Sequence, residues 1–161
     1  MVASVCWSRN GGQYLATGTH TGIVHLWDTE SQKLIRTFEG HEGRVGALTW
    51  SNSNMLSSGS KDKTILNRDL RVRDPYISRL EGHRQEICGL KWSFDDKYLA
   101  SGGNDNKLMV WSKNQNRSDM PLYKFSSHKA AVKAIAWSPH QSSLLCSGGG
   151  TADRCIKFWN T

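Results

Sequence analysis

Three histidines in this sequence are each followed, at similar distances, by a serine and then an aspartate. The sets are His41 with Ser58 and Asp62, His83 with Ser101 and Asp105, and His128 with Ser147 and Asp153. A histidine beside a carboxylate can serve as a general base. An active site is normally needed once, however, whereas this arrangement recurs along the chain. We therefore interpret the three sets as buried structural networks and not as catalytic residues.

The chain is built from repeats, and tryptophan marks each one. Trp7, Trp50, Trp92 and Trp137 recur at spacings of 43, 42 and 45 residues. Each tryptophan closes a short apolar segment, and a second segment ending in glycine follows 9 to 11 residues later. Two further segments follow in each of the first three repeats. The segments are short, rich in β-branched and aromatic residues, and bounded by turn formers, which predicts strands and no long helix.

Four short strands in every 42–45 residues, with the landmarks Gly40-His41, Gly82-His83 and Trp27-Asp28, resemble the blade of a WD40 propeller. The predicted fold is therefore all-β: a partial WD40 β-propeller with three full four-stranded blades and three strands of a fourth. We expect one domain of residues 1–161, with blades at about 1–39, 40–81, 82–126 and 127–161. The period and the lack of helices exclude ankyrin and tetratricopeptide arrays.

The resemblance to WD40 blades implies a role for the histidine sets. In such blades His, Ser or Thr, Asp and Trp form a hydrogen-bonded group that ties the loop before the blade to its third strand. The sequence supplies Trp111 for the set of His83 and Trp159 for the set of His128. In the set of His41, Arg68 stands where tryptophan is expected.

Charge and hydropathy limit the classes of partner that we expect for this chain. The formal net charge is +7, but Lys and Arg are scattered and no nucleic-acid motif accompanies them, so we expect no nucleic-acid partner. No apolar run approaches the roughly 18 residues of a membrane helix, and the first residues do not resemble a signal peptide. The sequence therefore predicts a soluble chain that is not secreted and has no membrane partner.

The cysteines lack metal-binding patterns. Cys6, Cys88, Cys146 and Cys155 form no C-x-x-C pair and have no histidine at metal spacing. We expect four buried, reduced thiols and no metal site, as in a cytosolic or nuclear protein. The sequon Asn116-Arg117-Ser118 is interpreted as a chance occurrence.

Longer strings give a narrower resemblance, which spans essentially the whole chain. The strings are His83-Arg84-Gln85-Glu86, Ser101–Leu108, Ala131–Pro139 and Thr151-Ala152-Asp153-Arg154-Cys155. They are similar to those of fizzy-related proteins, the Cdh-type activators of the anaphase-promoting complex. The resemblance implies blades two to five of a seven-bladed ring, with the activator's other parts outside this segment: the ligase-docking C-box, the destruction-box groove and the Ile-Arg tail.

That resemblance also implies a function without enzymatic activity. Such activators hold substrates against a ubiquitin ligase, so the implied partners are the anaphase-promoting complex and degron-containing proteins, with no cofactor, in nucleus and cytoplasm. The positions matching the KEN-degron site are Asn104, Asn106 and Thr151. The resemblance also implies a second site, for ABBA-type motifs, in the groove between blades two and three; in this chain the groove falls among residues 23–69, with no side chains assigned.

Other interpretations of the sequence are open. Asparagine in a tight turn often serves backbone geometry alone. The chain could be a generic WD40 scaffold in another complex, or a propeller hydrolase, which would need a catalytic constellation in one blade only. A half ring also leaves apolar blade faces uncovered, so we expect a piece of a longer protein or a truncated product.

Overall fold

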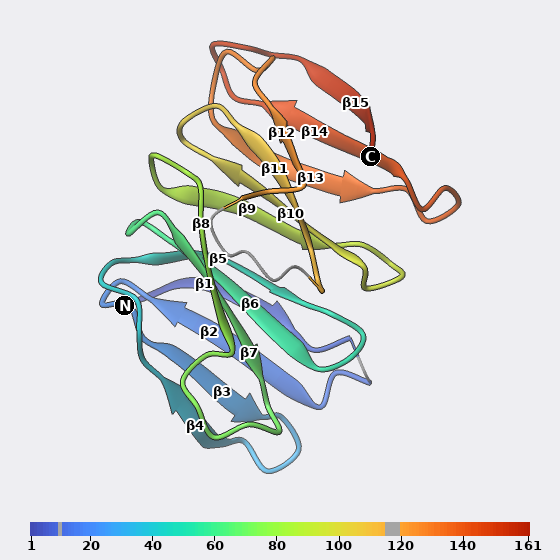
Figure 1. Cartoon of the computed structure of the whole chain (residues 1–161). Coiled ribbons are helices and arrows are strands. Elements are labelled where there is room, and N and C mark those ends of the chain that lie inside the picture. The colour runs from blue at the N-terminus through green and yellow to red at the C-terminus, as the bar shows by residue number, and fades with distance from the viewer. Residues whose placement is uncertain (10, 115–119) are drawn as a thin grey trace.

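The computed structural model describes residues 1–9, 11–114 and 120–161, and it consists of four antiparallel β-sheets arranged side by side (Figure 1). The first sheet contains β1 (Val2–Trp7), β2 (Tyr14–Thr19), β3 (Val24–Asp28) and β4 (Lys33–Phe38). The second contains β5 (Val45–Trp50), β6 (Met55–Ser60), β7 (Thr64–Asp69) and β8 (Ser78–Glu81). The third contains β9 (Ile87–Trp92), β10 (Tyr98–Gly103), β11 (Leu108–Ser112) and β12 (Tyr123–Phe125). The fourth contains β13 (Val132–Trp137), β14 (Leu144–Gly149) and β15 (Ile156–Asn160).

The predicted all-β class is confirmed, with three four-stranded sheets and one three-stranded sheet. No helix occurs in the described part of the chain, and so none that could cross a membrane. In each sheet the strands pair in sequence order. The sequon at 116–118 lies outside the described residues.

Neighbouring sheets meet along their first strands, where β1, β5, β9 and β13 contact one another in series. The tryptophans that end β5, β9 and β13 each connect their sheet to the one before. The three indole Nε1–H groups donate as follows: Trp50 to the carbonyl of Cys6 at 3.1 Å, Trp92 to Ser57 Oγ at 2.9 Å, and Trp137 to the carbonyl of Lys91 at 3.0 Å. The repeated tryptophan of the sequence is thus a joint between sheets.

Apolar side chains fill the spaces between the sheets. Between the second and third sheets, Ile65 and Leu80 pack with Ile87, Trp92 and Leu99. Strand alternation places these side chains on the facing surfaces, and burying each one contributes about 1.5–3 kcal/mol. Similar clusters join the first sheet to the second and the third to the fourth.

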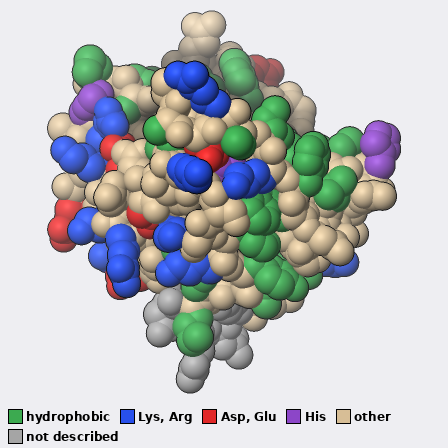
Figure 2. All heavy atoms as spheres, turned by 90° about the horizontal axis from the view of Figure 1, so that it is seen from above, with side chains coloured by type: hydrophobic (Ala, Val, Ile, Leu, Met, Phe, Trp, Pro, Cys, Tyr) green, Lys and Arg blue, Asp and Glu red, His purple; other side chains and the backbone are tan. Residues whose placement is uncertain are grey.

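The two end sheets each have one uncovered face. Trp7, the counterpart of the three buried tryptophans, is 58 % exposed on the first sheet. At the other end, Ile156 and Phe158 of β15 are 73 % and 70 % exposed. Figure 2 looks onto this end and shows hydrophobic side chains gathered in a band across it. These faces have the same apolar character as the surfaces that the interior sheets bury against each other.

The turns between the second and third strands of every sheet lie along one edge, which we call the rim (at the left in Figure 1). Backbone hydrogen bonds tie each of these turns to the residues entering the first strand of the same sheet. They join His20 N to the Met1 carbonyl (3.1 Å), Lys61 N to the Arg44 carbonyl (2.8 Å), Asn104 N to the Glu86 carbonyl (2.8 Å), and Gly150 N to the Ala131 carbonyl (3.0 Å). Each turn of the rim is therefore fixed to its own sheet.

The expectation of four buried thiols is wrong for Cys155 and holds only in part for the others. All four cysteines are free, and Cys6, Cys88 and Cys146 are half-buried in strands. Cys155 is exposed, because it lies in the turn before β15 on an end sheet where β15 itself is largely uncovered. Burial raises the pKa of the Cys88 thiol to about 11, so this group stays protonated. No group of three or more His, Cys, Asp or Glu residues in the described ranges is placed to hold a metal ion.

Gly102 allows the third and fourth sheets to approach closely. A Cβ atom at Gly102 would lie 2.1 Å from the backbone carbonyl oxygen of Val132 in the next sheet. We expect Gly102→Ala to lower the free energy of unfolding by about 2 kcal/mol, because one sheet must move. Gly150→Ala is the matched control, since a Cβ there meets nothing closer than 3.5 Å. Denaturant unfolding followed by tryptophan fluorescence measures both, and equal stability of the two variants would contradict the packing.

Candidate functional site

The three histidine sets form continuous hydrogen-bonded chains below the rim. The distances from His Nδ1 to an Asp carboxylate oxygen are 2.8 Å for His41 and Asp62, 3.0 Å for His83 and Asp105, and 2.5 Å for His128 and Asp153. The distances from His Nε2 to Ser Oγ are 2.8 Å for Ser58, 2.9 Å for Ser101 and 2.7 Å for Ser147. Trp111 and Trp159 complete the last two sets by donating from Nε1 to the serine Oγ at 2.8 Å.

The chemistry of the donors fixes the direction of each chain. An indole N–H can only donate and an ionised carboxylate can only accept. The serine therefore accepts from the indole and donates to His Nε2, while His Nδ1 donates to the carboxylate. A neutral histidine, with one donor and one acceptor nitrogen, completes this series of hydrogen bonds, so these buried polar groups are all paired.

The carboxylates also hold the loops of the rim. The backbone N–H that follows each histidine donates to its aspartate: Glu42 N to Asp62 at 3.0 Å, Arg84 N to Asp105 at 2.8 Å, and Lys129 N to Asp153 at 3.1 Å. Burial alone would raise the pKa of Asp62 and of Asp105, but the hydrogen bonds they accept outweigh it and keep both pKa values below the ordinary range. The hydrogen bond from His128 lowers the pKa of Asp153. All three carboxylates therefore stay ionised at neutral pH.

The sets cannot serve a substrate in solution. The side chains of His41, His83 and His128 are 0 %, 0 % and 1 % exposed. A general base must come within hydrogen-bond reach of the proton it removes. These three histidines are enclosed, and their contacts are those of a structural tie between the rim and each sheet.

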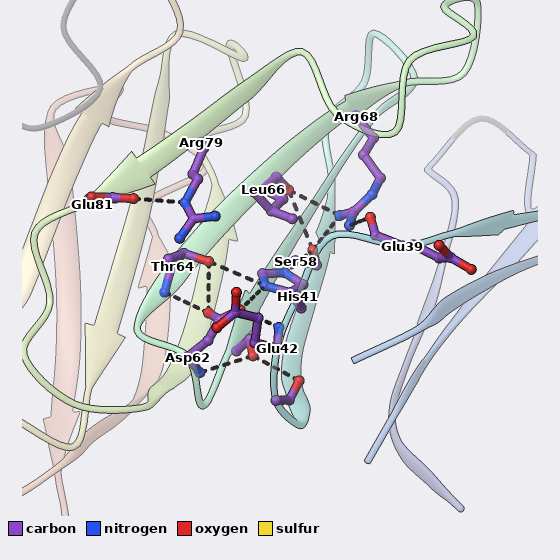
Figure 3. Close-up of polar contacts among 12 residues, drawn as sticks. Glu39, His41, Glu42, Ser58, Asp62, Thr64, Leu66, Arg68, Arg79 and Glu81 are labelled. Carbon is purple, nitrogen blue, oxygen red and sulfur yellow. Dashed lines mark hydrogen bonds and ion pairs between the residues drawn. The ribbon is translucent and has the colours of Figure 1, made fainter. Parts of the chain in front are cut away.

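Each histidine set takes the number of its sheet, so the set of His41 is the second, that of His83 the third and that of His128 the fourth. The sequence pattern did not reveal one member of the second set. Thr64 Oγ1 donates to Asp62 Oδ1 at 2.7 Å and lies 3.3 Å from His41 Nδ1 (Figure 3). A threonine two residues after the aspartate was the available signal. In the first sheet Trp27 donates to Thr17 Oγ1 at 3.1 Å, and Thr21 occupies the position of the aspartate.

Arg68 replaces the indole of the second set (Figure 3). Its guanidinium donates to Ser58 Oγ at 2.5 Å and to the Glu39 carbonyl at 3.4 Å, and it lies 5.4 Å from the ring centre of Phe38. Burial, with a further contribution from nearby Arg36, lowers the pKa of Arg68 to about 10, so it remains charged at neutral pH. Among the residues that the structure describes, its buried Nε atom has no hydrogen-bond partner. The second set therefore encloses a positive charge that the others do not.

In the third sheet, the rim turn between β10 and β11 exposes two amide side chains. Asn104 is exposed and Asn106 half-exposed, and both line a hollow of about 460 Å³. Within the described residues neither side-chain amide makes a hydrogen bond. Their donors and acceptors thus face solvent over a concave surface.

Backbone geometry does not explain the choice of asparagine at position 106. Asn106 adopts a left-handed conformation with φ of 63°, which asparagine tolerates well. The residues after the aspartate in the second and fourth sets, Lys63 (φ 75°) and Arg154 (φ 54°), adopt the same conformation. Because lysine and arginine occupy this position elsewhere, the turn alone does not require an amide.

Thr151 lies on the same rim, in the next sheet. It is exposed in the turn between β14 and β15. The serine and the aspartate of this set, Ser147 and Asp153, are two residues further apart than Ser101 and Asp105 of the third sheet. Strand β14 extends through Gly149, so this turn begins at Gly150 and not at Gly148 as the glycine run suggests. Thr151 and the two asparagines therefore come from rim turns of neighbouring sheets.

Comparison with known proteins identifies the fold and the family. The family model described as the CDC20/Fizzy WD40 domain matches residues 1–161. The chain belongs to the CDC20/Fizzy WD40 domain family. A chain in the crystal structure of a mitotic checkpoint complex has a TM-score of 0.93 and 46 % identity, covering 99 % of this chain and 47 % of that one. The predicted partial WD40 propeller and the predicted resemblance to fizzy-related proteins are both confirmed.

Two relatives illustrate how much of the family's length is present. Protein FIZZY-RELATED 1 of Arabidopsis thaliana is 60 % identical over 160 residues, which is 99 % of this chain and 33 % of the relative. Anaphase-promoting complex subunit cdc20 of Dictyostelium discoideum is 51 % identical over 160 residues and is covered to 32 %. The chain spans about a third of the length of such relatives.

Replacing Arg68 by tryptophan tests the description of the second set. Arg68→Trp supplies the indole donor used in the other sets and removes a buried charge. We expect the free energy of unfolding to rise by about 1–2 kcal/mol in denaturant titrations at pH 7, in the range seen when buried charges become apolar groups. The reverse variant, Trp111→Arg, is the control and should be clearly destabilised. A comparable loss in both variants would show that the second sheet is built around the guanidinium.

Proposed function

We propose that this chain carries a degron-recognising surface of an activator of the anaphase-promoting complex, and that it binds KEN-type motifs of cell-cycle proteins at Asn104, Asn106 and Thr151. The partners are then that ubiquitin ligase and the degron-bearing substrates. The observation that carries the proposal is the pair of unpartnered amide side chains over a hollow on the rim of a CDC20/Fizzy WD40 domain.

The chemistry of the three side chains suits such a peptide. A KEN motif offers an ammonium group, a carboxylate and an amide. Each asparagine amide can both donate and accept hydrogen bonds, and the threonine hydroxyl can do the same. Because the turns of Asn106 and Thr151 share one rim, an extended peptide could contact two sheets at once. The related Dictyostelium protein named above as an anaphase-promoting complex subunit supports the same assignment.

The proposed role is binding without catalysis. The enclosed histidine sets shape the rim, and ubiquitin transfer belongs to the partner ligase. The ABBA-type groove expected between blades two and three, among residues 23–69, remains a prediction.

Removing one amide tests the proposal. Asn106→Gly deletes the side chain and keeps the left-handed turn, since glycine accepts positive φ without strain. We expect the variant to bind a fluorescent KEN peptide about 10-fold more weakly, because a buried polar contact contributes roughly 1–3 kcal/mol. Fluorescence anisotropy on the purified protein measures the dissociation constants.

The matched control is Lys63→Gly, which makes the same change at the equivalent position of the second sheet. It should leave the affinity for the KEN peptide within about twofold of the original. If Asn106→Gly binds as well as the original protein, Asn106 is not part of the site. If the original protein itself does not bind the peptide, a general WD40 scaffold in another complex becomes the better assignment.

A further inference from the structure

The hollow beside Asn104 and Asn106 is lined by positive charge. Its other lining residues are Arg84, Gln85, Asp105, Lys107, Lys124 and Ser126. Three separate segments supply the three cations: the loop before β9, the β10–β11 turn and strand β12. Arg84 and Lys124 are exposed and Lys107 is half-exposed. Within the described part of the chain none of the three forms an ion pair.

The one acid in the hollow is already engaged. The Asp105 side chain is only 7 % exposed, and its oxygens accept from His83 Nδ1 and from the backbone N–H groups of Arg84 and Lys107. Because these donors already occupy the oxygens of Asp105, few of its lone pairs remain for hydrogen bonds with the cations above it. The solvent side of the hollow therefore carries net positive charge.

The second sheet provides an internal comparison. Strand register makes Arg79 the counterpart of Lys124, since each pairs with the residue four positions after the aspartate of its set, Leu66 or Met109. In the second sheet, however, Arg79 donates to Glu81 at 2.7 Å (Figure 3), whereas the third sheet has Ser126 at that position. The loop position of Arg84 is taken by Glu42. At the equivalent positions of the second sheet three cations are matched by three acids, namely Lys61, Lys63 and Arg79 by Glu42, Asp62 and Glu81. The rim of the third sheet has three cations and one acid.

We propose that this hollow binds acidic side chains that flank the degron in the substrate peptide. The inference rests on the proposed function, because Asn104 and Asn106 line the same hollow and a peptide held by their amides must continue past the cations. The ligand class is a carboxylate-rich peptide segment. Substrates with glutamate or aspartate next to the motif are preferred over substrates with neutral flanks.

The expected gain in affinity is moderate. An exposed ion pair contributes about 0.5 kcal/mol, so contacts to two or three cations tighten binding by about 5- to 12-fold at low salt. Because the cations are near the surface, the gain shrinks as ionic strength rises. Electrostatic attraction of this kind also adds specificity between otherwise similar peptides.

The test compares paired peptides on the purified protein by fluorescence anisotropy. KEN peptides carry three glutamates, or three glutamines, on the N-terminal or the C-terminal side, and a glutamate-rich peptide without the motif is added. We expect glutamate on at least one side to tighten binding at least threefold relative to glutamine. In Arg84→Gln/Lys124→Gln, which leaves Lys107 in place, this ratio falls below about twofold, while the control Arg79→Gln keeps it.

Three outcomes overturn the inference: no preference for glutamate on either side, a preference that survives Arg84→Gln/Lys124→Gln, or one that Arg79→Gln removes equally. The peptides also separate this inference from the proposed function. If glutamine-flanked KEN peptides do not bind but glutamate-bearing peptides bind through Arg84 and Lys124, the KEN assignment fails and the anion-binding hollow stands.

Discussion

The hydrogen bond between a buried histidine and an ionised aspartate is the contact on which this molecule's rim depends. In the third sheet, Asp105 accepts from His83 and from two backbone N–H groups, and so joins the loop before the sheet to the turn between β10 and β11. The histidine continues the connection through Ser101 to Trp111 in the core. A tight, exposed turn thereby acquires the rigidity of the sheet below it. Rigid support of this kind is what a binding surface built from loops requires.

Burying these polar groups leaves the rim itself free to vary. Below the rim the sets are nearly identical in geometry, and the aspartate is followed each time by a left-handed residue. Above it, Lys61 and Lys63 in the second sheet become Asn104 and Asn106 in the third. The substitution changes charge and hydrogen-bonding capacity without changing the turn. Each sheet thus presents different side chains on a turn of the same conformation. This explains how a repeated architecture can hold one localised binding site.

Most of the fold could be predicted from the sequence, because the structure repeats local rules. Trp50, Trp92 and Trp137 mark the joints between sheets, and alternating apolar residues between turn formers specify short strands. The pairing of each histidine with its serine and aspartate could also be inferred, since one spacing recurs three times. The exposure of Cys155 was missed, because Cys155 lies in the turn before β15, and β15 is itself largely uncovered on an end sheet.

The site was less predictable, for physical reasons. Asn104, Asn106 and Thr151 were selected by resemblance, whereas Arg84 and Lys124 lie forty residues apart in sequence and meet only when the third sheet folds. No local pattern indicates that their charges are left unpaired while those of the second sheet are neutralised. The arrangement of Arg68 against Phe38 likewise depends on tertiary packing. Local sequence periodicity determines the strands and their order, whereas contacts between residues far apart in the sequence determine which charges and polar groups the surface exposes.

The most direct test of this account is the affinity for a KEN peptide of Asp105→Ala compared with Asp62→Ala, measured at a temperature at which circular dichroism shows both variants folded. Both changes remove the carboxylate of a histidine set and should destabilise the protein to a similar degree, by about 1–3 kcal/mol. If the sets hold the rim turns in their binding shape, Asp105→Ala weakens peptide binding about 10-fold or more, and Asp62→Ala leaves it within about twofold. Equal affinities in the two folded variants would contradict the claim that the buried set beneath the third sheet positions the binding turn.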